Sequence, residues 1–337
     1  VIVKKGRVIG EGCHARCGGM HAERAALEAC TEDPAGATVY VTLEPCCHQG
    51  RQPPCTQALI ESGVARVVVG SRDPNPKVAG RGIAQLRAAG VAVEKDFLRR
   101  ECDALNPVFF HYITARTPYL KYAMTADGKL AARTGRSQWI TGEPARAHVH
   151  SLRSRYRAIL VGVGTILADD PLLNCRMEGG RDPLRVVLDS RLRTPLSARV
   201  CRTAQTQKTI FVCAVENAQK RAQLQALGAE VLCLGGADGR VDWVALMREL
   251  GAREIDSVLI EGGAEIQYSA LCAGVVQRLY VYVGAMLLGG AGAKSPVGGL
   301  GAPDPAEAFA LSAPEIELFG RDVLLSYDVL AREKEAF

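Results

Sequence analysis

The segment from Leu43 to Cys55 reads L-E-P-C-C-H-Q-G-R-Q-P-P-C and places three cysteines and one histidine within thirteen residues. The tripeptide H-A-E, residues 21–23, precedes it at the start of a stretch rich in helix formers. His21, Cys46 and Cys55 together make a three-ligand zinc site, and a catalytic zinc keeps its fourth position for water. Zinc lowers the pKa of such a water toward neutrality. Glu23, two residues after His21, is placed to reach that water without being a ligand and to shuttle protons.

The number of ligands and the position of Glu23 distinguish a catalytic zinc site from a structural one. An H-x-E motif followed by P-C-x-x-C is the pattern of zinc nucleobase deaminases, although here eight residues separate Cys46 from Cys55. The alternative, a structural zinc site, usually shows four protein ligands. Adjacent cysteines rarely bind the same ion, so we leave Cys47 out, and we expect His48 to face the substrate or solvent. Three ligands and an acid at this offset favour catalysis.

The order of expected strands and helices predicts two layered α/β domains, residues 1–115 and 116–337, because 337 residues are long for one core. Asn106-Pro107 and Thr117-Pro118 mark the boundary. In the first domain we expect a hairpin of residues 1–3 and 8–10, strands at 38–43, 64–70 and 91–93, and helices at 21–30, 56–62 and 82–89. In the second we expect strands at 120–124, 158–163, 185–188, 209–213, 231–234, 257–260 and 278–283, helices at 144–153, 220–227, 243–250 and 266–273, and a surface loop at 284–301.

Composition excludes several classes of protein. A net charge of +5 suits an anionic small substrate as well as nucleic acid and decides nothing alone. Aromatic residues make up only 5%, and no dense basic stripe with interleaved aromatics appears, so a nucleic-acid deaminase or binding module is disfavoured. No apolar run approaches the ~20 residues of a membrane span, and no signal peptide pattern opens the chain. The chain starts V-I-V without methionine, so we expect its true N-terminus to be missing.

Twelve cysteines raise the question of a secreted disulfide scaffold, but the length and the absence of a leader pattern favour a cytoplasmic protein. Six of the cysteines are scattered singly, several of them in apolar runs. We expect these six to be buried free thiols in a reducing cytosol. They are Cys102, Cys175, Cys201, Cys213, Cys233 and Cys272.

The motifs H-A-E, L-E-P-C-C-H-Q-G-R-Q-P-P-C and R-D-P-N-P-K-V-A-G-R-G resemble the deaminase half of the bifunctional riboflavin biosynthesis deaminase/reductase family. The second half of the chain continues the likeness with K-Y-A-M-T-A-D-G-K, S-Q-W-I-T, G-V-G-T-I-L-A-D-D-P, V-L-D-S-R and I-E-G-G-A. The resemblance covers nearly the whole chain, and the long P-C-x8-C loop is typical of this family.

The resemblance implies an α/β fold with a cytidine-deaminase-like three-layer N-terminal domain and a dihydrofolate-reductase-like C-terminal domain. It implies two reactions on a small-molecule phosphoribosylaminopyrimidine. The first is zinc-dependent hydrolytic deamination of 2,5-diamino-6-(5-phosphoribosylamino)pyrimidin-4-one. The second is NADPH reduction of the ribosyl chain of 5-amino-6-(5-phosphoribosylamino)uracil to ribityl. The implied cofactors are Zn²⁺ and NADPH, and the family suggests a homo-oligomer assembled through the reductase domains, without nucleic-acid or membrane partners.

Carried over residue by residue, the resemblance makes His21, Cys46 and Cys55 the zinc ligands and Glu23 the proton donor, with His14 lining the deaminase pocket. Six positions in the second half fall where the family contacts the dinucleotide: Ala123, Trp139, Thr165, Asp169, Ser190 and the run opening at Gly263. Five fall at substrate positions: Ser137, Arg153, Leu173, Arg176 and Glu261. Lys121 and Asp127 lie in the pocket-lining strand motif.

Without the resemblance, the residues of the second half support a hydride-transfer function only in part. Residues 162–164, a lone G-x-G, suit tight packing at least as well as phosphate contact, whereas the glycine pair 262–263 before a helix could hold a pyrophosphate on backbone N–H groups. Ser190 and Arg191 suit a 2′-phosphate, although a structural turn explains Arg191 equally well. The guanidinium forks of Arg153 and Arg176 match phosphate oxygens, although a solvated surface position explains either arginine equally well. Glu261 either caps a helix or grips substrate hydroxyls, and no general acid for the reduction emerges.

Departures from the family keep one alternative open, a reductase-only enzyme with an impaired deaminase domain. The family begins with a helix and an S-P-N-P-x-V-G segment that contributes an asparagine to the deaminase pocket, and this sequence starts after that segment. The usual H-A-E-V is H-A-E-R here, with Arg24 expected to face solvent. T-A-D-G-K replaces the commoner S-L-D-G.

Overall fold

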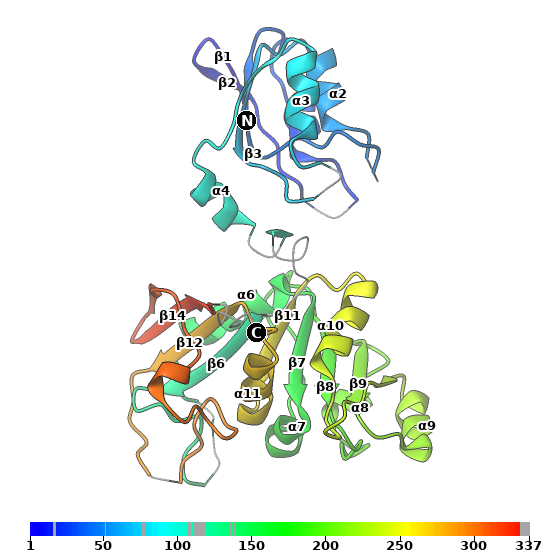
Figure 1. The fold of residues 1–337 in the computed structure, drawn as a ribbon, viewed down its shortest axis with the longest axis vertical. Helices are drawn as coiled ribbons and strands as arrows, with labels where there is room; N and C mark the ends of the chain where they lie inside the picture. Colours follow the sequence, from blue (N-terminus) through cyan, green and yellow to red (C-terminus); the bar gives the residue numbers. More distant parts are fainter. Residues whose placement is uncertain are drawn as a thin grey trace. The chain divides into compact units, whose positions relative to one another are not determined.

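A computed structural model describes residues 1–15, 18–50, 52–75, 78–106, 109–110, 119–134, 137, 139–290 and 292–330. The chain forms two compact units, residues 1–115 and 116–337 (Figure 1), and each is described by itself. Along the described part of the chain, no helix combines the length and the apolar character needed to cross a membrane.

The first unit is built on a five-stranded sheet in the order β2-β1-β3-β4-β5. Its hairpin is antiparallel, and Lys5 and Gly6 both have positive φ, 50° and 75°, as the tight turns that join twisted strands require. β3, β4 and β5 are parallel to one another. The strands are β1 (Ile2–Lys4), β2 (Arg7–Gly10), β3 (Thr38–Leu43), β4 (Arg66–Ser71) and β5 (Ala92–Glu94), and the helices are α1 (Ala22–Glu28), α2 (Cys55–Glu61), α3 (Arg81–Ala88) and α4 (Arg99–Leu105).

Helices cover both faces of this sheet, which gives three layers. Val67 and Val69 of β4 belong to the core formed with α1, α2 and α3. Successive side chains of a strand point to opposite faces, and a Cβ on Gly70 would lie 2.3 Å from Cys102 Sγ in α4. α4 therefore packs on the face opposite to the other three helices, and glycine lets it approach β4 closely.

The second unit contains a nine-stranded sheet in the order β10-β9-β8-β7-β11-β6-β12-β14-β13. The strands from β10 to β12 run parallel, and β14 and β13 continue the sheet as an antiparallel pair. These strands are β6 (Tyr119–Thr125), β7 (Ala158–Gly162), β8 (Leu184–Leu188), β9 (Thr209–Cys213), β10 (Glu230–Cys233), β11 (Val258–Gly262), β12 (Arg278–Gly284), β13 (Glu315–Phe319) and β14 (Asp322–Asp328).

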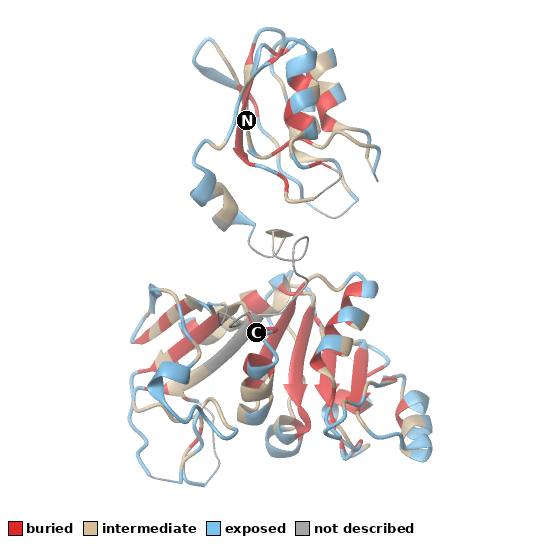
Figure 2. Ribbon diagram, viewed as in Figure 1, coloured by how far each residue is buried: buried red, intermediate tan, exposed pale blue. Residues whose placement is uncertain are grey.

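Two cores lie on the two faces of the larger sheet. Alternation along β7 sends Ala158 and Leu160 into the core under α10 and α11, and Ile159 and Val161 into the core under α7, α8 and α9. Buried residues accordingly gather along its central strands (Figure 2). The helices are α6 (Glu143–Arg155), α7 (Val163–Asp169), α8 (Arg199–Arg202), α9 (Ala218–Ala226), α10 (Trp243–Ala252) and α11 (Ala264–Cys272), with a 3₁₀ turn η1 (Pro305–Glu307).

Every strand and helix expected from the sequence is present, with ends shifted by a few residues at most. The expected surface loop at 284–301 holds no helix or strand beyond the end of β12 in its described residues. The sequence did not predict α4, α7, α8, β13, β14 or the 3₁₀ turn η1. The predicted strand 158–163 was one residue too long, because β7 ends at Gly162 and α7 begins at Val163.

The expectation for the six scattered cysteines was partly wrong. Cys201 and Cys213 are buried, as predicted, and Cys102 and Cys175 are half-buried, whereas Cys233 and Cys272 are exposed. Their positions explain the error, because Cys233 ends the edge strand β10 and Cys272 ends α11.

Candidate active sites of the two units

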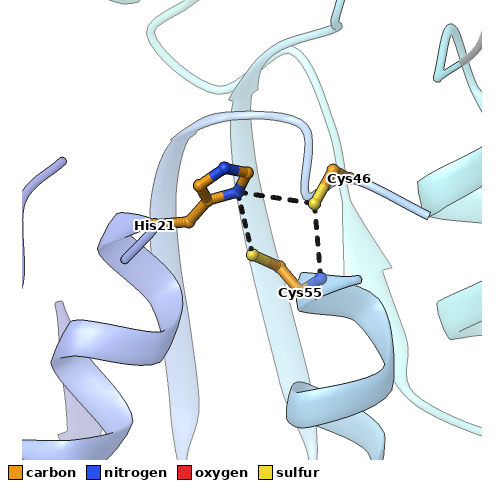
Figure 3. Close-up of side chains that lie close together, drawn as sticks. All are labelled: His21, Cys46 and Cys55. Atoms are coloured by element: carbon orange, nitrogen blue, oxygen red, sulfur yellow. Dashed lines mark hydrogen bonds between the residues drawn. The ribbon is translucent and has the colours of Figure 1, made fainter. Parts of the chain in front are cut away.

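His21, Cys46 and Cys55 converge because each stands at the end of an element. His21 is the residue before α1, Cys46 lies in the loop that follows β3, and Cys55 is the first residue of α2. His21 Nδ1 lies 3.5 Å from Cys46 Sγ and 3.4 Å from Cys55 Sγ, and all three donor atoms lie within 4.8 Å of one another (Figure 3). One imidazole nitrogen and two sulfurs at these separations fit a zinc ion with one open position.

The electrostatics of this site favour a bound cation. The Cys55 thiol donates to Cys46, and the backbone N–H of Cys55 also donates to that sulfur at 3.3 Å, so the pKa of Cys46 is lowered to about 5. The pKa of Cys55 is raised, because its proton is held against Cys46 and because it is desolvated. Burial raises the pKa of Glu23, which lies beside both thiols. Glu23 thus combines proximity to the donor atoms with a carboxyl group that holds its proton more tightly than an exposed one.

Several side chains hold the loops of this site in place. Glu44 is 2% exposed and accepts the backbone N–H groups of Gly80 and Ile83 at 2.9 and 3.1 Å, which ties the end of β3 to the start of α3. His14 donates from Nδ1 to the Met20 carbonyl at 3.0 Å, and its ring meets the His21 ring edge-on at 5.2 Å between centroids.

The expectation that Arg24 faces solvent holds only in part, because its side chain is half-buried and bonded to the chain. Its Nε donates to the Pro53 carbonyl at 3.3 Å and its guanidinium donates to the Pro54 carbonyl at 3.2 Å. Arg24 therefore links α1, whose first turn carries Glu23, to the loop just before Cys55. This contact joins residues about 30 positions apart, which explains why the local H-A-E-R pattern gave no sign of it.

The second unit contains a cavity of about 1820 Å³. All eleven residues assigned from the resemblance to the dinucleotide or the substrate line it, although they come from six separate stretches of the chain. They are Ala123, Ser137, Trp139, Arg153, Thr165, Asp169, Leu173, Arg176, Ser190, Glu261 and Gly263. Of the two further motif residues, Asp127 accepts the backbone N–H groups of Leu288 and Gly289 instead of lining the cavity, and the side chain of Lys121 lies outside what the structure describes.

Two of these residues form a buried ion pair. Arg153, near the end of α6, donates from Nε and Nη2 to the two oxygens of Glu261 at the end of β11, at 2.8 and 2.7 Å. The side chains are only 15% and 7% exposed, and Arg153 also donates to the Asn174 carbonyl at 3.0 Å. The sequence pointed to two separate substrate contacts, and the structure joins them into one bidentate unit in the cavity wall.

A buried arginine outside the predicted set shapes the same wall. Arg185 is fully buried and donates to the Leu172 carbonyl at 3.2 Å and to both the hydroxyl and the carbonyl of Thr203. Gln207 donates to the neighbouring Leu173 carbonyl at 3.2 Å. These bonds hold the loop that carries Leu173, whose φ of 55° is rare for a leucine. Sequence reasoning missed Arg185 because a single arginine within an apolar strand carries no motif.

The open questions about glycines and turns have structural answers. A Cβ on Gly162 would lie 2.5 Å from Ile266 Cγ1, which explains that glycine by close packing between β7 and α11. Gly263 is the residue before α11, and the first backbone N–H groups of a helix have no hydrogen-bond partner within the helix. Residues 189–194 form a structural turn, which was one of the two interpretations of Arg191, since Leu192 N–H donates to the Asp189 carbonyl. Arg191 still lines the cavity beside Ser190.

A further cavity residue was missed. The Arg146 guanidinium lies 4.7 Å from the centroid of the Trp139 ring, and both side chains line the cavity. Trp139 remains 59% exposed, so its ring is available to a ligand. Arg146 lies three residues into α6 and belongs to none of the motifs, so the sequence offered no signal for it.

Comparisons with known proteins match both units. The cytidine and deoxycytidylate deaminase zinc-binding region matches residues 1–71, and the RibD C-terminal domain matches residues 117–325. These matches and the two sheets confirm the predicted α/β fold class, and the first match agrees with the His-Cys-Cys group described above.

Relatives and solved structures cover nearly the whole chain. Riboflavin biosynthesis protein RibD of Actinobacillus pleuropneumoniae is 51% identical over 98% of this chain and 89% of its own. Acinetobacter baumannii RibD superposes with a TM-score of 0.85 at 33% identity, covering 98% of this chain and 91% of that one. A diaminohydroxyphosphoribosylaminopyrimidine deaminase/5-amino-6-(5-phosphoribosylamino)uracil reductase from Thermotoga maritima superposes with a TM-score of 0.83 at 35% identity, with the same coverage.

Proposed function

Because this chain belongs to the RibD family of riboflavin biosynthesis proteins, we propose that it catalyses two successive steps of that synthesis. The first unit deaminates 2,5-diamino-6-(5-phosphoribosylamino)pyrimidin-4-one with zinc. The second unit reduces the ribosyl side chain of 5-amino-6-(5-phosphoribosylamino)uracil to ribityl with NADPH. The observation that carries the proposal is the convergence of His21, Cys46 and Cys55 beside Glu23. This convergence gives no support to a reductase with an impaired deaminase domain.

In the deaminase site, zinc bound by His21, Cys46 and Cys55 would supply an activated water. Glu23 accepts a proton as the water oxygen bonds to the pyrimidine carbon that bears the amino group. Glu23 passes this proton to the adjacent ring nitrogen and then carries the remaining hydroxyl proton to the departing nitrogen, so that ammonia leaves and a carbonyl remains. Burial raises the pKa of Glu23, which makes its carboxylate a stronger base toward a proton of the water.

In the reductase site, bound NADPH would supply the hydride, and the residues of the cavity would hold the two reactants against each other. A cavity of about 1820 Å³ exceeds what one small molecule needs and suits a dinucleotide and a phosphorylated substrate together. Trp139 and Thr165 belong to the dinucleotide set. Arg153 and Glu261 offer a guanidinium edge and carboxylate lone pairs to the substrate while each neutralises the other.

The residues after β8 give the preference for NADPH over NADH. Ser190 and Arg191 both line the cavity, and among the described residues no carboxylate pairs with Arg191. The Ser190 carbonyl accepts the N–H groups of Ala214 and Val215 at 3.0 and 2.9 Å, so the backbone at this point is held firmly. An unpaired guanidinium on a fixed turn suits the 2′-phosphate that distinguishes NADPH.

Replacing Arg191 with alanine is expected to raise the KM for NADPH by about tenfold, because a charge-assisted hydrogen bond of ~1.5 kcal/mol is lost. The KM for NADH should stay within about twofold, since NADH has no 2′-phosphate to bind. Initial rates with the aminouracil substrate at varied dinucleotide concentration give both constants. Equal increases for NADPH and NADH would assign Arg191 to the turn alone.

The two activities are tested separately. The chain with zinc and the diaminopyrimidine phosphate, but no NADPH, should release ammonia and accumulate the aminouracil. The chain with the aminouracil phosphate and NADPH should oxidise NADPH without added zinc, because the cavity is built by the second unit alone. NADPH oxidation without ammonia release would favour the reductase-only alternative, and ammonia release without NADPH oxidation would refute the second half of the proposal.

The assembly and location of the chain complete the proposal. We propose a homo-oligomer formed through the reductase units, supported by the edge strand β13, where Ile316 and Leu318 are 64% and 74% exposed. Replacing both with lysine should lower the mass measured by light scattering to that of one chain, and an unchanged mass would exclude this edge.

A cytoplasmic location is supported by the free thiols of the described cysteines, which suit a reducing compartment.

A further inference from the structure

A second group of metal-ligating side chains lies in the reductase unit, outside the lining of its cavity. Cys213 is the last residue of β9, and Cys233 is the last residue of β10. They are direct partners in the register of this parallel pair, so their side chains leave the sheet on the same face. Glu216 follows in the loop after β9, and the two sulfurs and a carboxylate oxygen all lie within 4.8 Å of one another.

We propose that Cys213, Glu216 and Cys233 bind a second zinc ion or a similar thiophilic divalent cation. Two thiolates and one carboxylate make a three-ligand set, which water completes to a tetrahedron. Zinc–sulfur bonds of about 2.3 Å place neighbouring donors about 3.8 Å apart in a tetrahedron. The donor atoms already lie within 4.8 Å, so small side-chain rotations bring them to that separation.

Arg221 completes the charge and the geometry of this site. Its Nε and Nη2 donate to the two oxygens of Glu216 at 2.8 and 2.6 Å, and its Nη1 donates to the Val231 carbonyl at 2.6 Å. A carboxylate keeps further lone pairs free for a cation, and ligating carboxylates are commonly held by such outer partners. Two thiolates and one carboxylate carry three negative charges, which one divalent cation and Arg221 balance.

The position of the site links it to the dinucleotide end of the cavity. The Cys213 carbonyl accepts the N–H of Leu234, which follows Cys233, so the two strand ends are already joined. The next residues after Cys213, Ala214 and Val215, are those whose N–H groups hold the Ser190 carbonyl. A cation bound here would clamp the ends of β9 and β10 beneath the turn that carries Ser190.

Metal content tests the inference directly. The purified chain is dialysed against zinc buffered by a chelator at nanomolar free concentration and then analysed by mass spectrometry for zinc per chain. We expect two zinc ions in the unmodified chain, one in Cys233→Ser, one in Cys46→Ser and none in the double variant. Cys272→Ser, another exposed cysteine of the same unit, is the matched control and should keep two.

The pattern of results separates this site from the one near His21. One zinc in the unmodified chain, with the same value in Cys233→Ser, would overturn the second site and leave the first intact. Loss of zinc in Cys233→Ser but not in Cys46→Ser would overturn the first site instead. Cys233 is exposed, so its replacement should not unfold the chain, and an unchanged circular dichroism spectrum checks this. Zinc should also protect the unmodified chain, more than Cys233→Ser, against unfolding of the reductase unit by urea.

Discussion

Replacing Glu23 with glutamine is expected to lower the rate of ammonia release by about 10²–10⁴-fold, which is the usual contribution of a positioned general acid or base. The amide keeps the size of the side chain but can neither accept nor return the proton. The rate of NADPH oxidation with the aminouracil substrate should not change, because Glu23 lies in the other compact unit. Ammonia release and NADPH oxidation are measured on the same preparation.

The control for this variant is Glu28→Gln, which removes the same charge from the exposed end of the same helix. It should release ammonia at the unmodified rate. Zinc bound through His21, Cys46 and Cys55 should remain in both variants, because Glu23 is not among the three ligands. Ammonia release by Glu23→Gln at more than about a tenth of the unmodified rate would refute the role of Glu23 as the proton carrier.

Replacing Arg153 with methionine is expected to lower the free energy of unfolding of the reductase unit by about 3–5 kcal/mol, because it leaves the Glu261 carboxylate buried without a cation. The side chains are 15% and 7% exposed, so solvent screens the pair little. NADPH oxidation should be lost as well, since the pair lines the cavity. Urea unfolding followed by circular dichroism measures the first effect, and initial rates measure the second.

A second variant separates stability from substrate binding. Arg153→Met combined with Glu261→Leu removes both charges, and replacing a whole buried pair with apolar groups often costs little stability. We expect this double variant to recover most of the lost free energy of unfolding and to remain inactive in NADPH oxidation. Recovery of activity together with stability would mean that the pair only supports the fold and does not contact the substrate.

The sequence predicted the grouping at His21 because its members stand at element ends with recognisable local signals. A helix start, a strand end and a P-P-C helix start are all readable within a few residues, and parallel strands bring such ends to one edge of the sheet. The same reasoning placed the glycine pair 262–263 at the start of α11. Alternation of apolar strands and amphipathic helices was enough to find the parallel part of both sheets.

The parts that could not be predicted depend on long-range contacts. The strands β13 and β14 carry little β-branched character, and they are defined by pairing, β14 with β12 and β13 with β14. The Arg153–Glu261 pair joins residues 108 positions apart, and no local pattern predicts it. Cys213 and Cys233 looked like isolated thiols because only the register of β9 against β10 brings them together.

The measurement that tests the account most directly follows both reactions in one vessel. The chain is given zinc, NADPH and the diaminopyrimidine phosphate, and ammonia and NADPH are quantified over time. We predict that ammonia appears first and that NADPH oxidation then follows until the two amounts are equal. NADPH oxidation that precedes or exceeds ammonia release, or ammonia release with no NADPH oxidation at all, would contradict the assignment of two successive reactions to this chain.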